Sequence, residues 1–456
     1  MERIPPGTDE VAPLRELGAV IDSIDFAAAG RWMHEFIREL YPICRSITGD
    51  GLRATLRAIA HQVPLEIREV PSGTSVFDWT VPKEWNIREA WVKDPSGRKV
   101  IDFARSNLQV VNYSVPVHTT MPLADLRSHL HTLPDRPDWI PYRTSYYRET
   151  WGFCLPHREL AELQEGDYEV LIDASLRDGA LSYGELVLPG RRGEEILLSC
   201  HACHPSLAND NLSGIAVTTQ LARLLTGIRR EYTYRFLWIP GTIGAITWLA
   251  LNEANASRVA HGLVVACVGD PGRFHYKKTR RGDATIDRAV VQALRDLGWD
   301  LEVRGFSPYG YDERQYGSPG FNLAVGSLTR TPHGRYPEYH TSADDLELVR
   351  GSALAESLRA YLEVFRILEE DRCYLNRNPK CEPQLGKRGL YRAIGGLADA
   401  GRQELAMLWV LNQSDGTHSL LEIAERSGLP FPAIVQAART LRNHDLLEEA
   451  PRRGEA

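Results

Sequence analysis

The stretch that decides the fold runs from residue 199 to residue 214 and reads SCHACHPSLANDNLSG. An apolar run at 196–198 leads into it, and residues 215–225 follow with apolar side chains at helical spacing. This order predicts a buried strand, a loop and the start of a helix. In open α/β sheets such a loop lies at the carboxyl edge of the strands, where ligands bind.

The loop is dense in groups that bind metals. It holds the imidazoles of His201 and His204, the thiols of Cys200 and Cys203, and the carboxylate of Asp210. Imidazole nitrogen with carboxylate oxygen suits zinc or a similar divalent cation. Two other interpretations stand beside this one: the histidines as ordinary loop residues, and Asp210 as a helix cap. A redox pair is disfavoured because histidines interleave the thiols and no second Cys-x-x-Cys is present.

A second segment, 336–345, reads YPEYHTSADD and favours the metal interpretation. A strand, His, loop, Asp-Asn-x-Ser-Gly and helix, followed late by Tyr-His-Thr-x-x-Asp, resembles the zinc aminopeptidases of the co-catalytic metal class. The whole chain more closely resembles a bacterial family of aminopeptidase-like proteins with a winged-helix tail. The stretches that carry this closer resemblance are PICRSITG at 42–49, IPGTIG at 239–244 and DERQ at 312–315. It implies a context in surface-polysaccharide biosynthesis.

The resemblance also implies the metal ligands. The His after the strand is His201, the carboxylate of Asp-Asn-x-Ser-Gly is Asp210, and the late histidine is His340. We expect these three to hold one Zn²⁺, since three protein ligands leave a coordination position for water. His204 is the substitute ligand if the loop folds differently. Asp270 matches, less securely, a carboxylate that ends a later strand in the family pattern.

The chain departs from the aminopeptidase pattern at one important place. The family's Glu-Glu pair, a general base and a second-metal ligand, is replaced here by Gly241 and Thr242. Neither side chain can accept a proton or hold a second metal, so a two-metal mechanism is disfavoured. Hydrolysis still needs a base. We take Glu313 as the first candidate and Glu338 as the second, with a solvated charge cluster as the alternative interpretation of residues 312–314.

Three further residues are candidates for binding substrate. The planar fork of Arg314 can pair with a substrate carboxylate. Glu149 lies within a cluster of aromatic residues and can meet a substrate amine. Arg45 lies in a predicted turn, where it either faces the substrate groove or serves only the turn.

The pattern of apolar residues divides the chain into three parts. Alternating helices and strands predict an α/β aminopeptidase-like domain with a mostly parallel mixed sheet, formed by residues 20–75 and 155–375. The strand expected near 170–173 would feed this sheet. Residues 76–154, rich in proline, short strands and aromatic residues, predict a small β-rich inserted domain that acts as a lid. Short helices in 390–456 predict a winged-helix domain.

Composition limits the class of protein. The chain has 456 residues, of which 43% are hydrophobic and 25% charged, as in an ordinary globular protein. A net charge of −7 disfavours general binding to nucleic acid or to anionic membranes. Seven scattered cysteines do not suggest a disulfide framework, and no apolar stretch is long enough for a signal peptide core or a membrane span. We therefore expect a cytoplasmic location.

The leading hypothesis is a zinc-dependent hydrolase of aminopeptidase type that cleaves an amide next to a free amine. Its substrate would be a short peptide or an amide on a sugar or cell-wall precursor. The second hypothesis is a binding or regulatory protein that keeps the metal but lacks catalysis and docks a partner protein through the winged helix. The third is a DNA-binding regulator, disfavoured because acidic residues surround Arg439 and Arg442 in the third helix. The sequence leaves the oligomeric state open.

Overall fold

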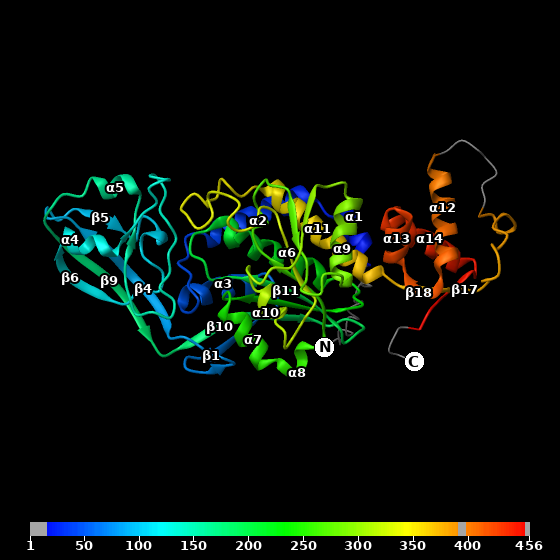
Figure 1. The fold of residues 1–456 in the computed structure, drawn as a ribbon, viewed down its shortest axis with the longest axis horizontal. Helices are drawn as coiled ribbons and strands as arrows, with labels where there is room; N and C mark the ends of the chain where they lie inside the picture. The colour runs from blue at the N-terminus through cyan, green and yellow to red at the C-terminus, as the bar shows by residue number, and fades with distance from the viewer. Residues whose placement is uncertain (1–15, 391–397, 452–456) are drawn as a thin grey trace, which may run out of the picture.

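The computed structural model describes residues 16–390 and 398–451 of the chain. It has three parts in a row (Figure 1): a small β-rich part, a central α/β domain and a helical module at the carboxyl end. No helix within the described residues combines the length and apolarity needed to cross a membrane.

The central domain is built on an eight-stranded sheet in the order β1-β10-β12-β11-β13-β16-β14-β15. The strands are β1 (Glu66–Pro71), β10 (Ala180–Leu188), β11 (Glu195–His201), β12 (Thr233–Ile239), β13 (Val259–Val265), β14 (Phe274–Lys277), β15 (Leu301–Arg304) and β16 (Val325–Thr329). β12, β11, β13 and β16 run parallel to one another; β10 is antiparallel to both β1 and β12, and β14, with its parallel neighbour β15, runs antiparallel to β16. Every residue of β11 is buried, as expected for a central strand covered on both faces. The predicted mostly parallel mixed sheet is confirmed.

Helices cover both faces of this sheet. One core is formed with α1 (Leu17–Ser23), α2 (Phe26–Leu40), α3 (Asp50–Ala60), α6 (Gly214–Thr226), α9 (Thr285–Asp296) and α11 (Gly351–Glu370). The other core contains α7 (Ile243–Leu251) and Tyr316 of the short helix α10 (Glu313–Tyr316). α7 begins shortly after β12 ends, and α10 begins after the loop that follows β15. Both helices border the edge of the sheet where the candidate site lies.

The β-rich part is larger than the sequence predicted. Its four-stranded sheet has the order β5-β4-β9-β6, formed by β4 (Glu84–Lys93), β5 (Lys99–Asp102), β6 (Val117–Pro122) and β9 (Asp167–Arg177). β9 pairs antiparallel with β4 and β6, so the strand expected to feed the central sheet near 170–173 belongs here, beyond the expected boundary at 154. Its apolar residues Tyr168, Val170 and Ile172 are buried in the core of the insert, and an apolar alternation alone does not reveal which sheet a strand joins.

Glu84 joins the two places where the chain crosses between the insert and the central domain. Its carboxylate accepts hydrogen bonds from both terminal nitrogens of Arg53 in α3, at 2.9 and 2.7 Å. It also accepts the backbone N–H of Ala180, the first residue of β10, at 3.1 Å. The guanidinium of Arg53 lowers the pKa of Glu84 to about 2. Glu84 therefore stays charged and fixes the base of the insert to α3.

The carboxyl-terminal module is a winged helix, as predicted, but it begins earlier than residue 390. Its strands are β17 (Cys373–Asn376), β18 (Asp415–Ser419) and β19 (Leu447–Glu449), and its helices are α12 (Ala398–Gln413), α13 (Leu420–Ser427) and α14 (Phe431–Asn443). β17 lies between β18 and β19 in one sheet and follows α11 directly. A four-residue strand in a polar stretch gives little sequence signal, because its partners lie about 40 to 70 residues further along.

The winged helix is attached to the central domain by charged contacts. Arg288 of α9 pairs with Glu422, at 3.2 Å, and with Glu425 of α13. Asp296 at the end of α9 accepts the backbone N–H of Phe431 at 2.8 Å. On α14, Arg439 lies 3.4 Å from Glu370 of α11. The third helix of the module thus turns at least one of its arginines toward the α/β domain.

Candidate metal centre

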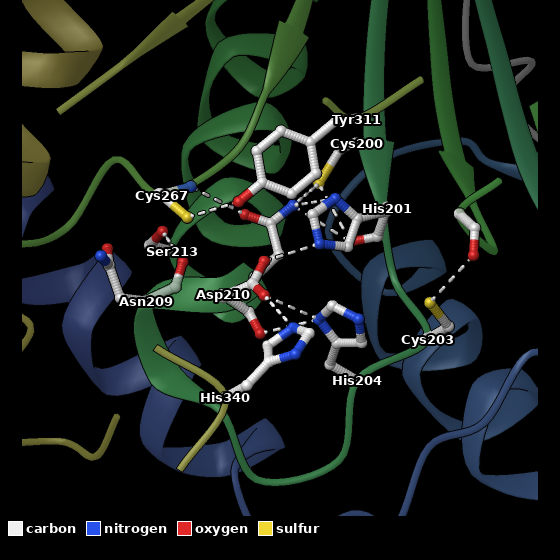
Figure 2. Close-up of polar contacts among 12 residues, drawn as sticks. Cys200, His201, Cys203, His204, Asn209, Asp210, Ser213, Cys267, Tyr311 and His340 are labelled. Carbon is white, nitrogen blue, oxygen red and sulfur yellow. Dashed lines mark hydrogen bonds and ion pairs between the residues drawn. The ribbon is translucent and has the colours of Figure 1, made fainter. Parts of the chain in front are cut away.

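Three imidazoles meet one buried carboxylate at the carboxyl edge of β11 (Figure 2). Asp210 is fully buried, and its Oδ1 lies 2.8 Å from Nε2 of His201. Its Oδ2 lies 3.0 Å from Nε2 of His340 and 3.2 Å from Nδ1 of His204. His201, His204 and Asp210 each offer a ligand atom, all within 4.8 Å of one another. The structure brings His201, Asp210 and His340 together and adds His204, which the sequence placed only as a substitute.

Two other carboxylates hold the loop that carries Asp210. Asp344 accepts the backbone N–H of Asn209 at 2.5 Å and that of Asp210 at 3.0 Å. Asp270 accepts the side-chain amide of Asn209 at 3.1 Å and the hydroxyl of Thr331 at 2.5 Å. Asp270 is therefore occupied in supporting the loop, which differs from the strand-end site carboxylate that the sequence suggested. Asp344 ends the Tyr-His-Thr-x-x-Asp motif, and its supporting role was not predicted.

The charges of these groups suit a divalent cation. Burial lowers the pKa of His201, which favours the neutral ring. Burial alone would raise the pKa of Asp210, but His204 and the hydrogen bonds from the imidazoles hold it well below its ordinary value. Burial opposes the charge on His204 as well, yet Asp210 raises the pKa of that ring. Imidazole nitrogens around one carboxylate match the donor set that zinc takes in proteins. The residues present therefore fit Zn²⁺.

Aromatic rings fix the orientation of the imidazoles. Tyr311 stacks on His201 with ring centroids 5.0 Å apart, and Tyr339 stacks on His340 at 3.9 Å. Tyr142, from the insert, lies edge-on to His204 at 5.2 Å and to His340 at 5.0 Å. Its backbone N–H donates to the carbonyl of His340 at 2.8 Å. The insert thus contacts the metal-binding loops directly, in the position expected of a lid.

A pocket of about 190 Å³ opens beside the imidazoles. It is lined by His201, His204, Gly241, Thr242, Tyr309, Gly310, Tyr311, Asp312, Arg314, His333, Tyr339 and His340. A Cβ added at Gly241 would lie 3.1 Å from Cβ of His201 and 3.6 Å from Oδ1 of Asp312. A methyl group at this position would therefore press on the Cβ of His201, so glycine is the residue that fits here without a shift of that side chain.

Both residues predicted as general bases lie outside the pocket lining. Glu313 is buried, but its Oε1 pairs with Nζ of Lys277 at 2.7 Å. Glu338 is half-buried, and its carbonyl accepts the backbone N–H of Thr341. The structure therefore places neither carboxylate beside the imidazoles, because the chain turns Glu313 toward β14 on the other side of its loop.

The three predicted substrate-binding residues lie in different places. Arg314 lines the pocket, in line with a role in substrate binding. Arg45 is fully buried, and it donates to the carbonyl of His204 at 2.7 Å and to that of Leu40 at 2.8 Å. It braces the metal-binding loop from behind, where burial lowers its pKa to about 10. Glu149 is exposed and pairs with Lys83 at 2.9 Å, outside the pocket lining.

Asp312 is the pocket residue that sequence reasoning missed. Its side chain is 1% exposed, and no group in the described parts of the chain donates a hydrogen bond to either of its carboxylate oxygens. Burial raises its pKa to about 7, and the neighbouring Glu313 contributes to the rise. The available signal was its place in the Asp-Glu-Arg-Gln stretch, which does not say which of the two acids faces inward.

The fold and the His–Asp cluster define an aminopeptidase-like domain followed by a winged helix. Residues 34–371 match a family described as a domain of unknown function, DUF4910, and residues 372–449 match a winged helix-turn-helix family. The chain belongs to the DUF4910 family, since the match spans most of its length.

Relatives agree with this assignment. A protein of Clostridium acetobutylicum named "Putative polysaccharide biosynthesis protein with aminopeptidase-like domain" is 54% identical over 419 residues, covering 92% of this chain and 96% of the relative. A crystal structure of a "putative peptidase" from Clostridium acetobutylicum has a TM-score of 0.90 and 51% identity, covering 95% of this chain and 99% of that one. A zinc aminopeptidase of Bacillus subtilis has a TM-score of 0.54 at 13% identity, covering 74% of this chain and 93% of that one. The last similarity is one of fold alone.

Proposed function

We propose that this protein is a zinc-dependent hydrolase of aminopeptidase type, which cleaves an amide next to a free amine. The observation that carries the proposal is the convergence of three imidazoles on buried Asp210 at the mouth of a pocket. His201, Asp210 and His340 would hold one ion, with His204 as a fourth donor. Bound there, zinc would polarise the scissile carbonyl and make a coordinated water more acidic.

The surrounding residues support this chemistry. Tyr311 and Tyr339 limit the rotation of the His201 and His340 rings, which keeps their nitrogens aimed at Asp210. Tyr142 of the insert covers His204 and His340 and reduces access of water from that side. The pocket is smaller than the roughly 300–1,000 Å³ of sites for drug-sized ligands. It suits a short terminal group, such as one aminoacyl residue, better than a long peptide segment.

The test combines metal analysis with a hydrolysis screen. The purified full-length protein is expected to bind one zinc ion and to release product from at least one aminoacyl amide or short peptide. His340→Ala is the control, expected to lose zinc and turnover together. Failure of the zinc-loaded protein to hydrolyse any amide in a broad panel would contradict the proposal.

A second candidate function has its own supporting observation. Gly241 and Thr242 line the pocket where the resembling aminopeptidases carry their Glu-Glu pair, so those two acids are absent from the site. A binding or regulatory protein could keep the metal to recognise a ligand and use the winged helix to dock a partner protein. Zinc binding without turnover would favour it. The pairing of Arg439 with Glu370 supports docking over DNA binding, since that arginine is already engaged.

A further inference from the structure

Asp312 differs from the other carboxylates around the site because it accepts no hydrogen bond within the described residues. Asp210 faces three imidazoles, Asp344 accepts two backbone N–H groups, and Asp270 accepts from Asn209 and Thr331. Asp312 is equally buried, yet no donor in the described residues reaches either of its oxygens. A buried carboxylate without a hydrogen-bond donor is destabilising, so its presence needs an explanation, and a catalytic role is one.

Its position relates it to the metal centre. Asp312 lines the same pocket as His201 and His340. The point where a Cβ on Gly241 would stand is 3.6 Å from Oδ1 of Asp312 and 3.1 Å from Cβ of His201. Asp312, Gly241 and the candidate ligand His201 therefore border one pocket of about 190 Å³, which has room for a water molecule.

The neighbouring acid shares the burial but not the position. Oε1 of Glu313 pairs with Lys277 at 2.7 Å, Oε2 has no hydrogen-bond partner in the described residues, and the residue is not part of the pocket lining. Arg314 does line the pocket, and its charge acts on Asp312 in the direction that favours the carboxylate form. Of residues 312–314, the acidic Asp312 and the positively charged Arg314 line the pocket, whereas Glu313 does not.

We propose that Asp312 is the general base of the hydrolysis, supplied by the loop before α10 in place of a side chain at Gly241. This inference rests on the proposed function. It assigns the role of the base to a residue that lines the pocket.

The proton balance of the step is simple. A water in the pocket beside Asp312 gives one proton to an oxygen of Asp312 while its oxygen forms a bond to the amide carbonyl carbon. The C–N bond then breaks, and the proton on Asp312 passes to the leaving nitrogen. The products are a carboxylic acid and an amine, and Asp312 returns to the carboxylate. A group with a pKa raised to about 7 is well matched to taking up and releasing a proton near neutral pH.

The test uses Asp312→Asn in the full-length zinc-loaded protein. Asparagine has nearly the same shape, and no hydrogen bond from the described residues is lost, so folding is expected to be preserved. We expect kcat to fall about 10²–10⁴-fold, as for loss of a general base. The zinc content and zinc affinity, measured by titration with zinc alone, should match the wild type, and KM should change little.

Two further variants sharpen the result. Asp312→Ala should regain part of its kcat when formate is added, because a small carboxylate can occupy the emptied space, whereas His201→Ala should not respond. Asp300→Asn is the matched control: Asp300 is an exposed acid outside the pocket, 3.4 Å from Arg273, and its loss should leave kcat unchanged.

The possible outcomes separate the two proposals. Wild-type kcat in Asp312→Asn overturns the assignment of the base and leaves the proposed function intact. A rise in KM at unchanged kcat also overturns it, because Asp312 would then bind the substrate amine. Loss of zinc would make it a ligand instead. Absence of amide turnover in the zinc-loaded wild type overturns both proposals.

Discussion

β11 and β12 are neighbours in the parallel sheet and end at the same edge, but their ends are chemically opposite. β11 ends on His201 and leads into the loop that carries His204 and Asp210. β12 ends on Ile239, which pairs with His201 in register, and leads into Pro240, Gly241 and Thr242. One strand end presents a metal-binding set, whereas the other presents no acid or base.

The difference between the two strand ends teaches that the proposed metal ligands and the proposed base come from separate parts of the chain. The β11 loop is held by Asp344, Asp270 and Arg45, each through hydrogen bonds to the loop. At the β12 end the loop is held by the thiol of Cys203, which donates to the carbonyl of Gly241 at 3.8 Å, and no carboxylate or imidazole of residues 240–242 is available to the pocket. Asp312, from a loop far along the chain, lines the same pocket as Gly241 and Thr242.

The largest effect is expected at the centre of the metal-binding strand end. Asp210→Asn removes the anion that three imidazoles share, and we expect zinc affinity to fall by more than the roughly 10–100-fold typical of an outer-shell partner. Turnover should be lost with the metal. Zinc titration followed by calorimetry measures the affinity. Wild-type zinc binding in Asp210→Asn would contradict the proposed metal-binding role of the loop after β11.

A smaller loss of zinc affinity is expected from a change at Asp344, which holds the backbone of the loop that carries Asp210. Asp344→Asn weakens acceptance of the backbone N–H groups of Asn209 and Asp210, so the loop should lose its fixed geometry. Zinc affinity should fall about 10–100-fold, as for other outer-shell groups. The same titration gives the value, and the control is Asp345→Asn, at the half-buried neighbour whose Oδ1 accepts the backbone N–H groups of Glu347 and Leu348 rather than those of the loop. An effect as large as that of Asp210→Asn would mean that Asp344 is itself a ligand.

At the β12 end, narrowing the pocket should slow turnover without removing the metal. Gly241→Ala places a methyl group 3.1 Å from Cβ of His201 and 3.6 Å from Oδ1 of Asp312, so it reduces the space beside the proposed base. We expect kcat to fall about tenfold, equivalent to roughly 1.4 kcal/mol, with zinc content unchanged. The control is Gly227→Ala, since a Cβ at Gly227 meets nothing within 4 Å. An unchanged kcat in Gly241→Ala would show that the space beside the proposed base has no role.

The smallest effect concerns the insert that covers both strand ends. Glu84→Gln removes the charge that pairs with Arg53, and we expect a loss of about 1–2 kcal/mol in unfolding free energy at pH 7. Because the folded pKa of Glu84 is lowered to about 2, its contribution is present above the unfolded value near 4.5 and is lost as pH falls toward 2. Urea unfolding at pH 7 and pH 3 should therefore show a smaller difference between wild type and variant at the lower pH.

The control for this effect lies on the same strand. Glu89→Gln changes an exposed acid of β4 that pairs with Lys99 at 3.1 Å, and exposed pairs contribute about 0–1 kcal/mol. A difference that is constant with pH in Glu84→Gln would exclude the ion pair as the cause.

Local patterns were sufficient to predict much of this molecule. The apolar run before His201 and the helical spacing after Gly214 predicted the strand, loop and helix that the structure contains. The resemblance to the zinc aminopeptidases implied that His201, Asp210 and His340 would share one place, and they do lie together.

Other features depend on contacts that no local pattern encodes. β9 joins the sheet of the insert through pairing with β4 and β6, and β17 finds its partners after α12 and α14. Asp312 and Glu313 are adjacent acids, and only the packing of their loop against β14 decides that Lys277 takes Glu313 and leaves Asp312 facing the pocket. The identity of the inward carboxylate is therefore a property of the tertiary structure.

The central claim is that the β11 loop and His340 together hold a zinc ion. The most direct measurement is anomalous X-ray scattering at the zinc edge from crystals of the full-length protein grown with zinc. The account predicts one strong peak about 2.0–2.2 Å from nitrogens of His201 and His340 and from an oxygen of Asp210. Zinc-equilibrated crystals with no peak among these side chains would contradict it.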